Sequence, residues 1–126
     1  SERWEELSNE IGPMLARRGE PSANEKERIA GLMRRLIECL TNKHVFNDLR
    51  HQYKPKTLQV SEFHAFTRLV PLEAAEADPL RDIYANLSPP EHDDPRNFYT
   101  TRSRTQFSTW LDQINAIKTA LEARRP

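Results

Sequence analysis

Residues 103–121 read SRTQFSTWLDQINAIKTAL, and this stretch decides how the chain folds. Ser103 and Gln106 have the S-x-x-Q spacing of a capping box, in which each side chain satisfies a backbone donor at the start of a helix. Apolar residues then recur at helical spacing over an arc of about 120°. They are Phe107, Trp110, Leu111, Ile114, Ile117 and Leu121. Such a stripe needs a groove to bury it, so the pattern predicts a closing helix near 104–122.

A second capping-box pattern, Ser22 with Glu25, precedes a wider apolar face. Its members are Ile29, Leu32, Met33, Leu36, Ile37 and Leu40. On a helical wheel they span an arc of about 180°, which is wider than a helix with one neighbour needs. The width indicates neighbours on two sides, so we expect the helix near 25–41 to be central.

The rest of the chain predicts several shorter helices. A first helix begins near Trp4, and Gly12-Pro13 is expected to break or kink it, because proline lacks the N–H that a helix interior uses. Apolar spacing indicates further helices within 45–53 and 61–70. Asp78-Pro79 has the pattern of a capping aspartate followed by proline at the first helical position. Together these patterns predict an all-α fold, a compact bundle of about six or seven short helices.

The size and composition of the chain fit one globular domain. At 126 residues, with 37% hydrophobic and 30% charged residues, it can bury a core without disulfides or a structural metal. We therefore expect a single helical domain over residues 1–126. Because the chain begins at Ser1 without a methionine, we also expect it to be excised from a larger protein.

Cysteine content and hydropathy indicate an intracellular protein. Cys39 is the only cysteine, so no intramolecular disulfide can form, and a reducing compartment is the default expectation. No apolar run approaches the ~20 residues that a bilayer-spanning helix needs, and no secretion signal pattern is present. We expect a cytoplasmic or nuclear location and no membrane insertion. The oligomeric state is left open by the sequence.

Charge is polarised along the chain although the net charge is zero. Residues 1–56 carry eleven basic and nine acidic side chains, and residues 57–100 carry three and eight. The last segment, residues 101–126, carries five basic and two acidic side chains. Strong nonspecific binding to nucleic acid usually requires an overall basic excess, so this composition does not favour it.

No pattern indicates an enzyme or a cofactor. The chain contains no G-x-S-x-G elbow, and its three glycines are too far apart for a phosphate-binding loop. His44, Asp48 and His51 are metal-ligand types at i, i+4 and i+7. Three ligands on one helix rarely converge on a tetrahedral centre, so we favour a solvated polar face and expect no metal.

Candidate partner-binding residues lie in and before the closing helix. Lys118 projects inside the apolar arc, either because its aliphatic stem lets the amine reach solvent or because this face is shared with a partner. Aromatic anchors such as Trp110 are favoured at protein interfaces. The candidate set is completed by three residues near the start of this helix. They are Tyr99, Arg102 and Arg104.

Two functions follow from these patterns as hypotheses. The first is a noncatalytic adaptor or scaffold module that binds another protein or a peptide segment in a groove between helices. The alternative is a nucleic-acid-associated helical module with a local basic and aromatic surface. Its candidate basic residues are Lys54, Lys56, Arg102 and Arg104.

Overall fold

The computed structural model describes residues 3–45, 67, 69–90 and 94–125, and their regular structure is entirely helical. The elements are α1 (Trp4–Ala16), α2 (Ala23–Leu40), the π-helical turn η1 (Thr41–Val45), α3 (Ala74–Leu87), α4 (Pro95–Thr100) and α5 (Arg104–Ala123). The predicted all-α class is confirmed. The described part of the chain holds five α-helices rather than six or seven. The helices expected within 45–53 and 61–70 fall mostly outside the described residues.

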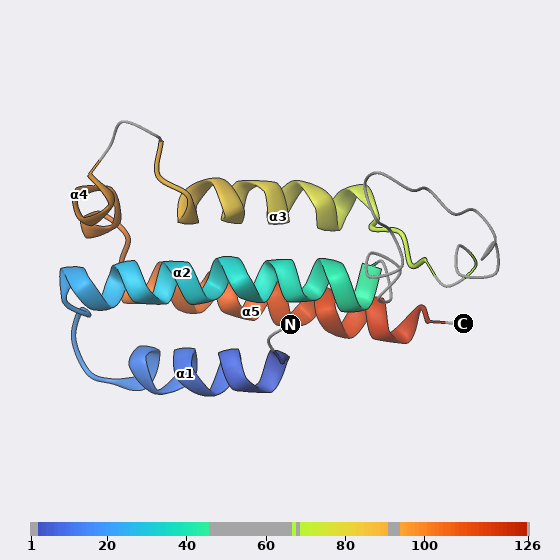
Figure 1. The fold of residues 1–126 in the computed structure, drawn as a ribbon, viewed down its shortest axis with the longest axis horizontal. Helices are drawn as coiled ribbons and strands as arrows, with labels where there is room; N and C mark the ends of the chain where they lie inside the picture. The colour runs from blue at the N-terminus through green and yellow to red at the C-terminus, as the bar shows by residue number, and fades with distance from the viewer. Residues whose placement is uncertain (1–2, 46–66, 68, 91–93, 126) are drawn as a thin grey trace, which may run out of the picture.

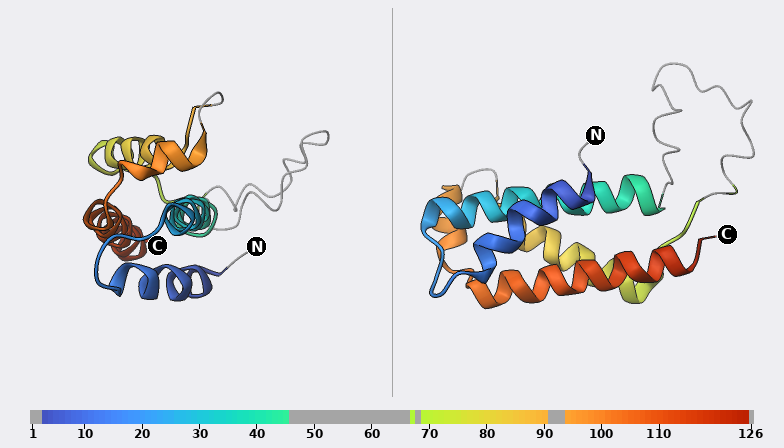
Figure 2. Two further views of the ribbon diagram at one scale, coloured as in Figure 1. Left: turned by 90° about the vertical axis from the view of Figure 1, so that its left-hand side faces the viewer. Right: turned by 90° about the horizontal axis from the view of Figure 1, so that it is seen from below.

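The long helices lie along the length of the molecule around α2 (Figure 1). In that view α3 covers one side of α2 and α1 the other, while α5 runs beside α2, and the short α4 lies across one end of the bundle. The end-on view in Figure 2 shows the same grouping. α2 contacts every other helical element described, so its predicted central position is confirmed.

Both predicted capping boxes are present. The Ser22 hydroxyl accepts a hydrogen bond from the Glu25 amide at 3.2 Å, and the Glu25 carboxylate accepts from the Ser22 amide at 3.1 Å. Ser103 and Gln106 repeat this exchange at the start of α5, at 3.1 and 2.8 Å. Two orphan donors are satisfied at each helix start, which fixes where α2 and α5 begin.

The core follows the two apolar faces that the sequence predicts. From α2 it takes Ile29, Leu32, Met33, Leu36, Ile37 and Leu40, and from α5 it takes Phe107, Ile114, Ile117 and Leu121. Trp110 and Leu111 are only half-buried and pack against this core. The stripe of α5 therefore has a buried centre and a partly open edge.

The helix start predicted at Asp78-Pro79 is wrong, and α1 has no break at Gly12-Pro13. α3 begins at Ala74, before Asp78-Pro79, because Glu76 accepts a hydrogen bond from the Glu73 amide at 2.9 Å and so caps the helix earlier. α1 continues through Pro13 to Ala16 without a break. A proline inside a helix removes one backbone hydrogen bond, and apolar burial on both helices offsets that loss.

An ion pair between a partly exposed arginine, 29% exposed, and a buried glutamate joins the end of α5 to the start of α3. The Arg124 guanidinium donates to both carboxylate oxygens of Glu76, at 2.8 and 2.6 Å, and also to the Pro71 carbonyl at 3.1 Å. Glu76 is only 8% exposed. Hydrogen bonding from Arg124 holds the pKa of the Glu76 carboxyl below its ordinary value. The pair therefore fixes where α3 lies along α5.

We expect Arg124→Leu to lower the free energy of unfolding by about 2 kcal/mol, because it leaves the Glu76 carboxylate buried without its partner. The matched control is Arg17→Leu, which removes an ion pair of similar length, 2.6 Å, whose arginine side chain is 65% exposed. Exposed pairs contribute less than about 1 kcal/mol. Urea unfolding at neutral pH measures both variants. Equal losses in the two would contradict the role assigned to Glu76.

Candidate functional site

A hollow of about 380 Å³ lies between α3 and α5, and we call it the Trp110 hollow. Its lining consists of Asp78, Pro79, Asp82, Ile83, Trp110 and Gln113. Ile83 is buried, whereas both aspartates are exposed. The hollow therefore has an apolar floor and an acidic wall.

The core holds the Trp110 ring in place. Its ring meets the fully buried Phe107 edge to face, with the ring centroids 5.6 Å apart and the planes at 89°. This geometry is one that aromatic pairs prefer. Trp110 therefore contacts the core on one side and lines the hollow on the other.

The acidic wall of the Trp110 hollow comes from one turn of α3. Asp78 and Asp82 are four residues apart and so lie on one face of the helix. No salt bridge within the described part of the chain involves either carboxylate. Pro79 has no N–H, which leaves the Ala75 carbonyl without its usual helical donor. The two carboxylates therefore give this wall a negative charge.

Lys118 lies away from the Trp110 hollow. Its Nζ is 2.7 Å from a Glu122 carboxylate oxygen and 5.2 Å from the centroid of the Trp4 ring on α1. The stem crosses the apolar face, and the amine finds both an anion and an aromatic face within the chain. Lys118 thus joins α5 to α1.

Tyr99, which the sequence suggested as a contact residue, belongs to the core. Its side chain is 1% exposed, and its hydroxyl donates to the Leu87 carbonyl at 2.6 Å. Nη1 of Arg34 donates to the same hydroxyl at 3.0 Å and to the Leu87 carbonyl at 2.8 Å. Burial raises the pKa of the Tyr99 hydroxyl. Tyr99 is therefore enclosed by its own chain in this structure, and its place among the partner-binding residues stays a prediction.

Arg102 and Arg104 make hydrogen bonds to main-chain carbonyls. The Arg102 guanidinium lies 3.7 Å from the centroid of the Phe98 ring and donates to the Phe98 carbonyl at 2.6 Å. Arg104 donates from Nη1 to the Leu15 carbonyl at 3.3 Å, across to α1. Neither arginine lines the Trp110 hollow. Lys54 and Lys56 lie outside the described residues. Their place near Arg102 and Arg104 therefore stays a prediction.

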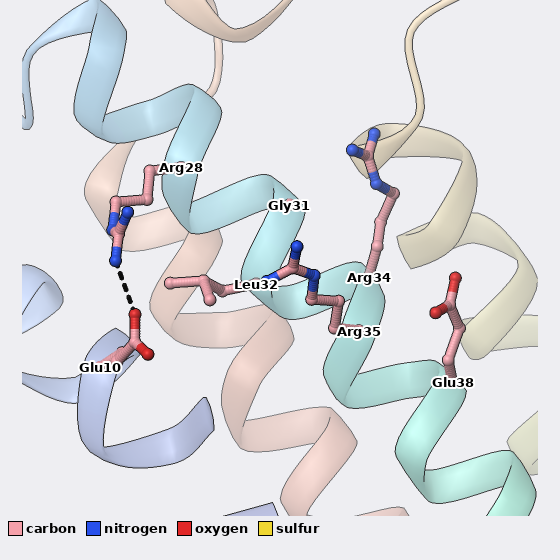
Figure 3. A pocket seen from close by; sticks show the side chains of 7 residues that line it. All are labelled: Glu10, Arg28, Gly31, Leu32, Arg34, Arg35 and Glu38. Carbon is pink, nitrogen blue, oxygen red and sulfur yellow. Dashed lines mark hydrogen bonds and ion pairs between the residues drawn. The ribbon is translucent and has the colours of Figure 1, made fainter. Parts of the chain in front are cut away.

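A second hollow, of about 470 Å³, lies over the middle of α2, and we call it the arginine hollow. It is lined by Glu10, Arg28, Gly31, Leu32, Arg34, Arg35 and Glu38 (Figure 3). The sequence predictions did not include this site. Arg28, Gly31 and Arg35 follow at i, i+3 and i+7, so the spacing alone could have placed them on one face.

The three residues suggested as metal-ligand types are not assembled by the described residues. His44 is 8% exposed, and its Nδ1 lies 3.2 Å from Nη2 of Arg125, while its ring packs edge to face on Trp4. Asp48 and His51 lie outside the described residues. Within the described ranges no group of three His, Cys, Asp or Glu side chains could hold a metal ion.

The described helices can be compared with the length and hydropathy that a membrane-spanning helix needs. None of them is both long enough and apolar enough to cross a bilayer.

Comparison with protein-family models, with curated proteins and with solved structures finds no match to this chain.

We expect the free energy of unfolding to decrease as the pH is lowered, because His44 titrates. Burial, and then the positive charge of Arg125, lower the pKa of His44 from its ordinary value of 6.5. Protons therefore bind the unfolded chain more readily than the folded one as the pH falls below 6.5. The contribution of His44 is fully present above that pH and is lost toward its lower folded pKa.

Urea unfolding across this range measures the loss, and His44→Phe is the matched variant because it keeps a ring against Trp4. Its stability should depend less on pH than that of the parent chain. The same slope in both proteins as the pH is lowered below 6.5, the ordinary pKa of histidine, would refute the assignment to His44.

Proposed function

We propose that this domain is a noncatalytic protein-interaction module whose Trp110 hollow binds a basic peptide segment of a partner protein. The observation that carries the proposal is the position of the Trp110 side chain beside Asp78 and Asp82, neither of which has an ion-pair partner among the described residues. The domain would serve as an adaptor or scaffold within a larger intracellular protein.

The electrostatics of the hollow favour a cation. Two like charges one turn apart on a helix repel each other, so Asp78 and Asp82 destabilise α3 slightly while no cation lies between them. A guanidinium or ammonium group would relieve that repulsion. The same group could lie against the Trp110 ring, where a cation–π contact contributes about 0.5–1 kcal/mol at exposed sites. Arginine suits this place best because its planar fork can stack and also donate to a carboxylate.

The size of the Trp110 hollow limits what can enter it. A volume of about 380 Å³ accommodates a few side chains rather than a whole helix. Ile83 and the Pro79 ring offer an apolar surface next to the carboxylates. We therefore propose a short segment in which one or more basic residues flank an apolar one. Trp110 would act as the central anchor, as aromatic residues often do at interfaces.

The nucleic-acid alternative has less support from the described residues. Arg102 donates to the Asn86 carbonyl of α3 and Arg104 to the Leu15 carbonyl of α1, so both are used in hydrogen bonds between elements. The acidic wall of the Trp110 hollow would repel a phosphate backbone, whereas it would attract a basic peptide. Both considerations favour a protein partner.

A fluorescence titration tests the proposal. Trp4 and Trp110 are the only tryptophans, so Trp4→Phe leaves Trp110 as the sole reporter of its kind. The probe is a short peptide with two arginines around a leucine in a glycine–serine background. We expect a saturable change in Trp110 emission that weakens as salt is added, because the attraction is partly electrostatic.

Asp78→Asn combined with Asp82→Asn should weaken this binding by about tenfold or more, which corresponds to about 1.4 kcal/mol. Asp112→Asn is the control, since Asp112 is also exposed but belongs to α5 and does not line the hollow. The proposal fails if the arginine peptide leaves the emission unchanged, or if a counterpart with glutamates binds equally well. Salt-sensitive binding of a single-stranded oligonucleotide instead would favour the alternative function.

A further inference from the structure

We propose that the arginine hollow on α2 binds a single phosphate group carried by a phosphorylated segment of a partner protein. This site shares no residue with the Trp110 hollow and does not depend on the function proposed for it. Three arginines and two glutamates line it, so the lining carries a net positive charge.

The fold holds one arginine of this site in a fixed position. Arg34 makes its two hydrogen bonds to the described chain through Nη1, to the Leu87 carbonyl at 2.8 Å and to the Tyr99 hydroxyl at 3.0 Å. Tyr99 is itself buried and donates to the same carbonyl. The guanidinium is a rigid planar fork, so fixing one nitrogen also fixes the direction of the others. A ligand that meets Arg34 therefore loses little side-chain entropy in binding it.

Gly31 provides a bare stretch of helix next to that fork. A Cβ added at Gly31 would meet Nη2 of Arg34 at 3.9 Å, which is ordinary van der Waals contact. Packing within the chain therefore does not require glycine here, although glycine in a helix interior is less stable than alanine. Its absent side chain leaves room over this part of α2, so a phosphate oxygen can reach Nη2 of Arg34 there.

Two further arginines lie within reach of a ligand over Gly31. Figure 3 shows Arg35 beside Gly31 and Arg28 directed toward Glu10 of α1. The Arg28–Glu10 pair is 2.7 Å long, and its side chains are 63% and 48% exposed. Exposed pairs of this kind are weak, so a more highly charged anion can compete with Glu10 for Arg28.

The two glutamates decide which anion fits. Glu10 and Glu38 lie toward opposite ends of the hollow, with Gly31 between them (Figure 3). A phosphate monoester carries about −1.5 to −2 charges at neutral pH and three acceptor oxygens, so it competes with them better than a carboxylate would. A nucleic-acid backbone would place further phosphates near both glutamates. A single phosphate on a peptide avoids that repulsion.

The glycine amides make a direct test possible by nuclear magnetic resonance. The full chain has three glycines, so the Gly31 amide has only Gly12 and Gly19 as companions in its spectral region. The probe is a short phosphoserine peptide in a glycine–alanine background, unlabelled, added to the labelled protein. We expect a saturable shift of the Gly31 amide and a steady position for Gly19, whereas Gly12 lies two residues from Glu10 and is not used as a reference. The unphosphorylated peptide should leave all three unchanged.

Two variants should weaken this binding without disturbing the core. Arg28→Gln combined with Arg35→Gln removes two exposed cations, and we expect the dissociation constant to rise by about tenfold or more. Gly31→Glu puts a carboxylate into the hollow and should abolish the shift of neighbouring α2 amides. Gly31→Ala is its matched control, and it should fold at least as stably as the parent. Arg81→Gln, exposed on α3, controls for loss of charge.

Several results would overturn the proposal. One is an unchanged Gly31 amide at millimolar phosphopeptide. Another is equal binding by inorganic phosphate and by the phosphopeptide, which would show an isolated anion site with no role for a partner segment. Equal binding by Gly31→Glu, or tighter binding of a single-stranded RNA of the same charge, would also reject a single peptide-borne phosphate. Circular dichroism of each variant shows that it has folded before the titration is interpreted.

Discussion

Burial of the two-sided apolar face of α2 is the constraint on which the rest of the fold depends. Burying a leucine or isoleucine side chain fully contributes about 1.5–3 kcal/mol to the stability of the fold relative to leaving it exposed. Exposing a face of this width to solvent would therefore be strongly unfavourable. A single neighbour would cover only part of it. α1, α3 and α5 therefore surround α2, and each contacts it. The positions of both hollows follow from how these helices lie against one another.

Two cationic residues of α2 hold the short helix α4 at the end of the bundle. Lys26 donates to the Thr100 carbonyl at 3.3 Å and meets the Glu20 carboxylate at 3.1 Å, although its side chain is only 8% exposed. Arg34 bonds the Tyr99 hydroxyl farther along the same helix. Isolated helices as short as α4 are not stable in water, so these two cations and the buried Tyr99 ring hold it at the end of the bundle. The side chain of Arg34 thus has a structural partner on one nitrogen and the open hollow near another.

Features coded by residues close in sequence could be predicted, and those coded by distant residues could not. The capping boxes at Ser22 and Ser103 and the two apolar faces need only local spacing, and they agree with the structure. The sequence pattern places the start of α3 at Asp78-Pro79, whereas the Glu73–Glu76 capping box sets it at Ala74 and Arg124 reinforces it from 48 residues away. Because the sequence pattern makes Asp78 the helix cap, it does not indicate that Asp78 and Asp82 lie one turn apart in α3 and form the acidic wall. The burial of Tyr99 could not be predicted because its partner Arg34 lies 65 residues away.

The preference for arginine over lysine has a structural reason. The chain has fourteen arginines and five lysines. Among the described residues, five arginines donate to main-chain carbonyls of another part of the chain, between 16 and 89 residues away: Arg34, Arg102, Arg104, Arg124 and Arg125. A guanidinium can make several such bonds at once in fixed directions, whereas an ammonium is a point charge on a flexible stem. An arginine without such a bond, such as Arg28 in its exposed pair with Glu10, can leave its partner for a ligand at low cost. The arginine hollow combines both kinds of arginine, because the fold holds Arg34 in place while Arg28 is in an exposed pair.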